Sequence, residues 1–194
     1  HCEFIKKILQ FYYIFKLEIF FLIIFHCKDN LDIKLQEFKF LNYQINSQIA
    51  EIIINRPPIN AFNIRLLDEI LSSLELAKND GTVRAVLIKS NLEKIFCAGL
   101  DLDILIDKPI LKVREFLERL YIKLWDIQYN IGKPTIAVVN GSARGGGMTL
   151  AISCDVILAS EDASFGYPEI NLGLPPAIHF IHLPKIIGLS LIHI

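Results

Sequence analysis

The sequence predicts an α/β fold with a mostly parallel sheet in one domain. Short apolar runs typical of buried strands alternate along the chain with amphipathic segments typical of helices. Their order is strand, helix, strand, helix, strand, which favours parallel strands joined by crossover helices. The chain has 194 residues, of which 53% are hydrophobic, and this is enough to bury a substantial core.

The first predicted elements are a β-hairpin and a helix. Residues 38–45 and 49–55 alternate or run apolar on either side of the polar turn 46–48, which is typical of two paired strands. Asn63 can cap a helix that stops near Gly81. The apolar face of this helix contains Leu66, Leu67, Ile70, Leu71, Leu74 and Ala77.

The later elements continue the alternation of strands and helices. They are, in order, a strand at 85–89, a loop with Gly99 at 96–102, an amphipathic helix at 111–125, a strand at 134–140, a helix after three glycines, and a strand at 156–159. Because helical segments separate these strands, we expect the strands to lie parallel in one sheet.

Charge and cysteine content argue against several classes of function. The net charge is −1, with 20 basic and 21 acidic side chains, so the chain offers no basic surface for nucleic acid. Four cysteines show neither a C-x-x-C pair nor a metal-ligand spacing, which favours a reducing compartment and a cytoplasmic location. His179 and His182 lie three residues apart, but no carboxylate or cysteine completes a site, so we predict no metal.

The N-terminal segment differs from the rest in composition. Met148 is the only methionine, so we do not interpret His1 as a start residue. Residues 4–27 are rich in Phe, Ile, Tyr and Leu, but charges leave only residues 19–27 uninterrupted, too few to span a bilayer. We therefore expect no membrane partner, with a membrane or targeting segment as the alternative.

These observations predict a folded core between two terminal segments that do not belong to the native protein. Residues 1–35 are interpreted as a spurious or non-native extension and residues 36–188 as the folded core. Residues 189–194 match the translation of a sequencing adapter, so we expect an adapter-derived tail there; a natural apolar helix start is the alternative.

Two motifs late in the chain suggest chemistry. Gly145, Gly146 and Gly147 precede a small apolar run, which indicates backbone that approaches a ligand closely and then begins a helix. Glu169 follows Tyr-Pro in an otherwise apolar segment and is a candidate acid or base. Together they predict an oxyanion-binding amide beside one working carboxylate, although an ordinary turn and a helix-start charge are the alternatives.

The order of five motifs resembles the crotonase superfamily, also called the enoyl-CoA hydratase/isomerase family. The motifs are NRPPINAFN at 55–63, FCAGLDL at 96–102, GSARGGGMTLA at 141–151, Cys154-Asp155, and FGYPE at 165–169. The resemblance covers about residues 38–188. It implies a crotonase-like (ClpP/crotonase) spiral of ββα units, incomplete because the family's C-terminal helical region is missing. It also implies acyl-coenzyme A thioester substrates, no bound cofactor, and a homotrimer or dimer of trimers when full length.

The resemblance also implies roles for individual residues. The backbone amides of Leu100 and Gly146 would form an oxyanion hole, and Glu169 would carry the proton. The positions that match the acyl-coenzyme A path are Ile59, Ala61, Ala98, Asp101, Leu102, Gly145, Thr149 and Pro168. Plain core packing is the alternative for the apolar members of this set.

The reaction depends on a departure from the family pattern. Hydratases of the family use two glutamates, whereas this chain has Thr149 at the first position and Glu169 at the second. One carboxylate suffices to move a proton between carbons 2 and 4, so we favour double-bond isomerisation. The alternatives are a hydratase (lyase) with an acid from Glu93, Asp101 or Asp103, a decarboxylase or thioester hydrolase, and a catalytically silent binding or assembly subunit. Either enzyme would serve fatty-acid metabolism.

Overall fold

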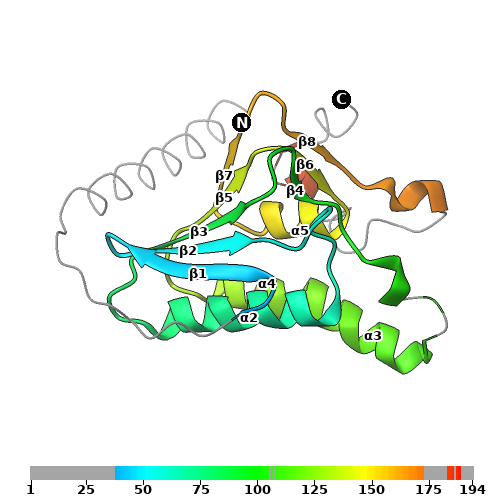
Figure 1. Ribbon diagram of the computed structural model, residues 1–194, viewed down its shortest axis with the longest axis horizontal. Helices are drawn as coiled ribbons and strands as arrows, with labels where there is room; N and C mark the ends of the chain where they lie inside the picture. The colour runs from blue at the N-terminus through cyan, green and yellow to red at the C-terminus, as the bar shows by residue number, and fades with distance from the viewer. Residues whose placement is uncertain (1–37, 105, 107, 173–182, 186, 189–194) are drawn as a thin grey trace, which may run out of the picture.

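The computed structural model describes residues 38–104, 106, 108–172, 183–185, 187 and 188 (Figure 1). Residues 1–35 and 189–194, the two ends predicted to be non-native, lie outside the described residues. His179 and His182 lie outside them as well. Within them the strands form two sheets, one of five strands in the order β1-β2-β3-β5-β7 and one of three in the order β4-β6-β8. The predicted α/β class is therefore confirmed, and none of the helices in this part of the chain combines the length and apolarity that a membrane span needs.

The five-stranded sheet begins with the predicted hairpin. Strands β1 (Leu41–Asn46) and β2 (Ile49–Ile54) pair antiparallel. The two residues between them, Ser47 and Gln48, have φ values of 49° and 67°, which matches the two-residue turn that suits the twist of a hairpin. The first strand starts at Leu41 rather than at the predicted residue 38.

The other strands of this sheet are parallel, as predicted. They are β3 (Ala85–Ser90), β5 (Thr135–Val139) and β7 (Val156–Ala159), and each pairs in parallel with its neighbour. Apart from Thr135, the buried residues of β2, β3 and β5 are branched or small apolar side chains, as strands covered on both faces require. This sheet is the scaffold from which the site loops emerge.

The three-stranded sheet corrects the sequence prediction at two places. Residues 95–97 form β4 (Ile95–Cys97), where a loop was expected from residue 96, and β6 (Ser142–Arg144) lies directly before the glycines. Strand β8 (Ser164–Gly166) completes the sheet, and all its pairings are parallel. Strands of three residues carry too little periodicity to be recognised from sequence.

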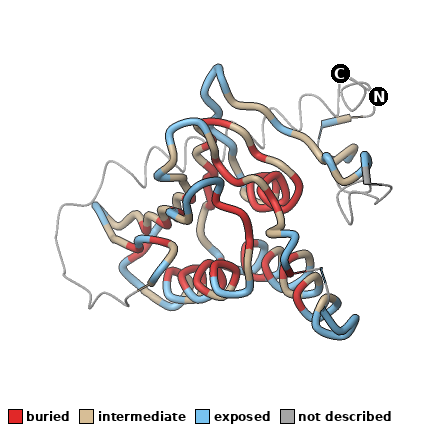
Figure 2. The backbone as a smooth tube through the Cα atoms, turned by 45° about the vertical axis from the view of Figure 1, so that its right-hand side comes forward, coloured by how far each residue is buried: buried red, intermediate tan, exposed pale blue. Residues whose placement is uncertain are grey.

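Helices cover the sheets and close the core. Helix α2 (Ile64–Asn79) and helix α4 (Leu124–Tyr129) lie along one face of the five-stranded sheet (Figure 1). Asn63 caps α2 as predicted, since its Oδ1 accepts a hydrogen bond from the N–H of Leu66 at 2.8 Å. All six residues predicted for the apolar face of α2 are buried. Helix α5 (Gly146–Ile152) contacts strands of both sheets and is buried along its whole length (Figure 2).

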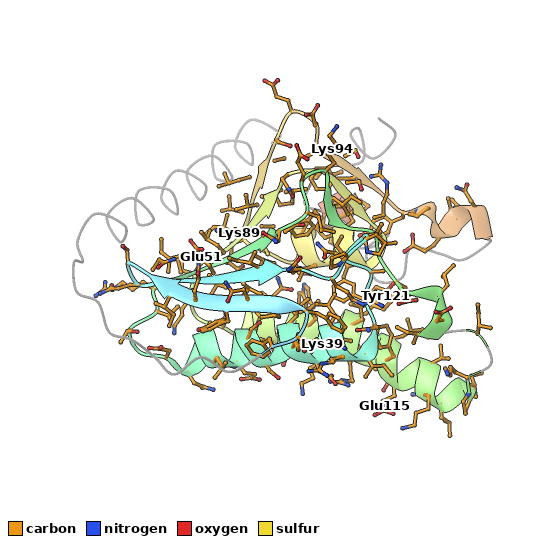
Figure 3. The ribbon with its side chains drawn as sticks, viewed as in Figure 1. Lys39, Glu51, Lys89, Lys94, Glu115 and Tyr121 are labelled. Atoms are coloured by element: carbon orange, nitrogen blue, oxygen red, sulfur yellow. The ribbon has the colours of Figure 1, made fainter. Side chains whose placement is uncertain are left out.

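The predicted helix at 111–125 is interrupted by a wider turn. Helix α3 (Ile110–Glu118) leads into a π-helical turn at Arg119–Lys123, which continues into α4. Leu120 and Leu124 are both fully buried. Single π turns inside α-helices occur frequently at functional sites, and this one places Tyr121 on the side of the helix that faces the sheets (Figure 3).

Candidate active site

The two predicted oxyanion loops lie directly against each other. A Cβ atom added to Gly99 would lie 2.9 Å from the carbonyl oxygen of Arg144 and 3.4 Å from the amide nitrogen of Gly146. Gly99 also has a φ of 97°, which side-chain-bearing residues rarely adopt. The close approach and the backbone angle both require glycine, and they bring the loop after β4 to the start of α5.

Backbone hydrogen bonds determine where the amide of Leu100 points. The N–H of Phe62 donates to the carbonyl of Gly99 at 2.7 Å, and the N–H of Asp101 donates to the carbonyl of Phe62 at 2.9 Å. These bonds form a parallel bridge between Phe62 and Leu100, so the N–H of Leu100 itself is directed away from Phe62. Within the described part of the chain, no acceptor bonds this N–H.

The amide of Gly146 lacks a partner within its own helix for a different reason. Gly146 is the first residue of α5, where the N–H groups have no partner within the helix. The helix dipole adds a partial positive charge at the same end. The loop that carries Leu100 thus lies against the start of α5, and N–H groups placed in this way can bind a developing oxyanion.

Glu169 reaches the same loop from the far end of the described chain. It lies in a 3-10 turn at Pro168–Leu172, directly after β8. A Cβ added to Gly145 would collide with Oε1 of Glu169 and lie 3.1 Å from its Cδ. The N–H of Gly145 donates to the carbonyl of Gly166 at 2.9 Å, which ties the two segments together. The carboxylate of Glu169 therefore lies beside the glycine that precedes Gly146.

Two tyrosines that sequence reasoning missed share this site with Glu169. Burial raises the pKa of Tyr121 to about 12, and the nearby charge of Glu169 adds to the rise. Burial likewise raises the pKa of Tyr167; a hydrogen bond with Thr149 opposes this, while Tyr121 and Glu169 reinforce it. Both phenols therefore stay protonated at neutral pH. Tyr121 gave no signal because it belongs to an apolar helix face, whereas Tyr167 adjoins the Pro-Glu motif.

Thr149 is fully enclosed behind the glycine loop. Its side chain is 1% exposed, and its hydroxyl donates to the carbonyl of Gly145 at 3.2 Å. The hydroxyl therefore supports the first turn of α5 at the position where the family's hydratases carry a glutamate. Among the described residues, Oε2 of Glu169 is buried without a hydrogen-bond partner.

The other residues predicted to bind the substrate differ in exposure. Ile59 is 42% exposed and Leu102 53% exposed, so both present apolar surface to solvent. Pro168 is exposed, Ala98 is half-buried and Ala61 is buried. Ala61 can therefore meet a ligand only through its backbone or through small movements of its surroundings.

Asp101 is engaged in an ion pair. Its Oδ2 lies 2.6 Å from Nη2 of Arg56, and both side chains are mostly shielded from solvent. Of the other acids considered for a hydratase, Glu93 and Asp103 are exposed. No contact among the described residues places Glu93, Asp101 or Asp103 beside Glu169.

Asn60 is a third residue that sequence reasoning missed. It is fully buried with a φ of 52°. Its Oδ1 accepts from the N–H of Arg56 at 2.7 Å, and its Nδ2 donates to Ser90 Oγ at 2.9 Å and to the carbonyl of Phe96 at 3.1 Å. Asn60 therefore joins the loop after β2 to β3 and β4. Its place within the 55–63 motif was the available signal.

The two cysteine thiols in the described residues are not ionised, and no group of metal-ligating side chains occurs in the same residues. Burial raises the pKa of Cys97 and of Cys154 to about 12, so both thiols are neutral at physiological pH. Among the residues that the structure describes, no three His, Cys, Asp or Glu side chains gather as metal ligands would.

Comparison with known proteins agrees with this geometry. Residues 44–193 match the family model described as Enoyl-CoA hydratase/isomerase. The chain therefore belongs to the enoyl-CoA hydratase/isomerase family. A solved structure from Legionella pneumophila, described as a crotonase of this family, superposes with a TM-score of 0.73 at 33% identity, covering 81% of this chain and 61% of that one. The predicted crotonase-like fold is confirmed.

The curated relatives carry hydratase names. The crotonyl-CoA hydratase of Syntrophomonas wolfei is 36% identical over 143 residues, covering 73% of this chain and 55% of the relative. The mitochondrial enoyl-CoA hydratase of Pongo abelii is 36% identical over 148 residues, covering 75% and 50%. The chain thus spans about half the length of the curated relatives it matches. The occurrence of a mitochondrial relative leaves the cytoplasmic location a prediction.

Proposed function

We propose that the protein isomerises the double bond of an enoyl-coenzyme A thioester, with Glu169 as the single proton carrier. The observation that carries this proposal is the contact between the carboxylate of Glu169 and the glycine loop that presents the amide of Gly146. The hydroxyl of Thr149 is directed to the carbonyl of Gly145, so this position supplies no second carboxylate. Coenzyme A enters as part of the substrate, and no separate cofactor is proposed.

The proposed reaction needs one base and one oxyanion hole. The carboxylate of Glu169 removes a proton from carbon 2 of a 3-enoyl thioester, and the electron pair moves onto the thioester oxygen as a dienolate. The N–H groups of Leu100 and Gly146 bind that oxygen, at about 3 kcal/mol per donor. The protonated Glu169 then returns the proton to carbon 4, which leaves the 2-enoyl thioester and restores the carboxylate.

Hydration of a 2-enoyl thioester is the second candidate. The hydratase names of the relatives favour it. Oε2 of Glu169, which has no hydrogen-bond partner among the described residues, can accept a hydrogen bond from a water molecule. In this reaction Glu169 takes a proton from the water that adds to carbon 3, and the same two amides bind the thioester oxygen of the enolate. The protonated Glu169 then gives its proton to carbon 2, which leaves the 3-hydroxyacyl thioester and restores the carboxylate.

The test measures both reactions separately. We would give full-length protein trans-3-enoyl-CoA and trans-2-enoyl-CoA in separate assays, beside Glu169→Gln and a control, Glu161→Gln, at an exposed position. We expect conversion of the 3-enoyl to the 2-enoyl thioester, lost in Glu169→Gln and retained in the control. Hydration without isomerisation would select the second candidate. Absence of both in folded protein would indicate a catalytically silent binding or assembly subunit.

The assembly and location are proposed with the activity. We infer that the full-length protein is a homotrimer or a dimer of trimers in the cytoplasm. Family membership supports the assembly, and the buried, neutral thiols are compatible with a reducing compartment. Light scattering after size-exclusion chromatography tests the assembly, and cell fractionation tests the location.

A further inference from the structure

The side chain of Arg56 joins two segments of the candidate site. Its Nη1 donates to the carbonyl of Ala61 at 2.7 Å, and its Nη2 lies 2.6 Å from Oδ2 of Asp101. The guanidinium is planar, so these two contacts fix the separation of the two partners. One partner is in the loop after β2, and the other adjoins the proposed oxyanion amide of Leu100.

The backbone passes this constraint to Leu100. Gly99 and Asp101, on either side of Leu100, are both hydrogen-bonded to Phe62, at 2.7 and 2.9 Å. Phe62 directly follows Ala61, whose carbonyl Arg56 holds. The guanidinium of Arg56 therefore completes a ring of contacts around Leu100. If the backbone at Asp101 moved, the N–H of Leu100 would turn away from Gly146.

The backbone near Arg56 is anchored without the help of its side chain. The N–H of Arg56 donates to Oδ1 of Asn60 at 2.7 Å, and Asn60 is held by Ser90 and Phe96. Removal of the guanidinium should consequently loosen the position of Asp101 without unfolding the loop after β2. This separates a local effect on Leu100 from a general loss of structure.

We propose that Arg56 is a positioning residue that orients the N–H of Leu100 through Ala61 and Asp101. The inference rests on the proposed function, because it assumes that this N–H binds the thioester oxygen. An amide that binds the oxygen mainly in the transition state affects kcat more than KM. A direct contact of Arg56 with a phosphate of coenzyme A would instead change KM.

The experiment compares Arg56→Met and Arg56→Lys with the wild type in steady-state kinetics of the full-length protein. We expect kcat to fall at least about tenfold in Arg56→Met and less in Arg56→Lys, because a misplaced donor loses transition-state stabilisation. The KM for the thioester should change by less than about threefold. Added guanidinium ion should restore part of the kcat of Arg56→Met.

The matched control breaks an ion pair away from the site. Nζ of Lys89 lies 2.9 Å from Oε2 of Glu51, between β3 and β2, with burial similar to that of the Arg56 pair (Figure 3). Lys89→Met should leave both kcat and KM unchanged. If circular dichroism shows Arg56→Met to be unfolded, Asp101→Asn replaces it, because this change keeps the shape and removes the charge.

Each outcome decides the question. An unchanged kcat, or a raised KM with an unchanged kcat, overturns the positioning role, the second result by showing Arg56 to be a substrate ligand. A wild-type protein that turns over no enoyl-CoA contradicts the proposed function itself and, with it, the positioning role of Arg56.

Discussion

The carboxylate of Glu169 lies against the α-carbon of Gly145, where a Cβ atom would overlap Oε1. Gly145 has a φ of 49° and a ψ of −118°, outside the regions that side-chain-bearing residues adopt. The loop that presents the amide of Gly146 and the proposed proton carrier are thus fitted to each other. The absence of a side chain at Gly145 makes this contact possible.

Gly145→Ala should therefore lower the activity of the protein. The new methyl group would displace the carboxylate of Glu169, and a displacement of about 1 Å can cost about a hundredfold in rate. We expect kcat on trans-3-enoyl-CoA to fall at least about tenfold. The control is Gly81→Ala, because nothing lies within 4 Å of a Cβ at Gly81. Wild-type kcat in Gly145→Ala would contradict the fitted contact.

Thr149→Glu should shift the reaction towards hydration. The family's hydratases carry a glutamate here, and a second carboxylate near Glu169 can help to activate water. Thr149 is 1% exposed, so the buried carboxylate should also lower the free energy of unfolding by about 1–3 kcal/mol. The measurement is the ratio of hydration to isomerisation. Thr149→Ser keeps the donor to Gly145 and should keep the wild-type ratio, and an unchanged ratio in Thr149→Glu would refute the idea.

Glu69→Gln should reduce stability in a pH-dependent way. Burial alone would raise the pKa of Glu69, but hydrogen bonds from the Arg65 side chain and from the N–H groups of Phe40 and Lys39 outweigh it and lower the pKa. Because the folded pKa lies below the ordinary 4.5, the ionised carboxylate stabilises the fold above that pH. Its contribution is lost as the pH falls through the lowered folded-state value.

The measurement for Glu69→Gln is urea unfolding at neutral and acidic pH. We expect the variant to be less stable by about 1–3 kcal/mol at neutral pH, since it leaves partly buried hydrogen bonds to Lys39, Phe40 and Arg65 poorly satisfied. The difference from the wild type should narrow in acid below about pH 4. A difference that stays constant with pH would show that the charge of Glu69 does not matter.

Asn63→Ala should destabilise α2 at its first turn. The Oδ1 of Asn63 accepts from the N–H of Leu66 at 2.8 Å, and loss of such a cap costs about 1 kcal/mol. Thermal unfolding of Asn63→Ala and Asn63→Asp checks this, because aspartate also caps a helix and should retain the stability. Equal losses in both variants would mean that the cap is not the cause.

Regular patterns made much of the fold predictable. The 16 residues of α2 present an apolar face at helical spacing, and burial of that face follows from periodicity alone. The hairpin was recognisable because two apolar runs flank a short polar turn. The second sheet was not recognisable, since β4, β6 and β8 have three residues each and are defined by pairing between distant segments.

The candidate site was predictable where its residues sit in motifs. Glu169 and the glycines stand out in an apolar context, and the family resemblance supplied Leu100, which acts through its backbone and has no side-chain signal. Tyr121 could not be predicted, because its spacing is that of an ordinary core residue. Its nearness to Glu169 arises only when the π-helical turn packs against the glycine loop.

The parallel pairing of β2, β3, β5 and β7 decides when the site forms during folding. Each parallel pair joins strands separated by a long crossover, and closing such loops costs entropy before any contact forms. Leu100 precedes β5 and Glu169 follows β7, so we expect the amide and the carboxylate to meet only after β7 has docked. Recovery of activity during refolding should then come late, after the helical circular dichroism signal to which α2 contributes.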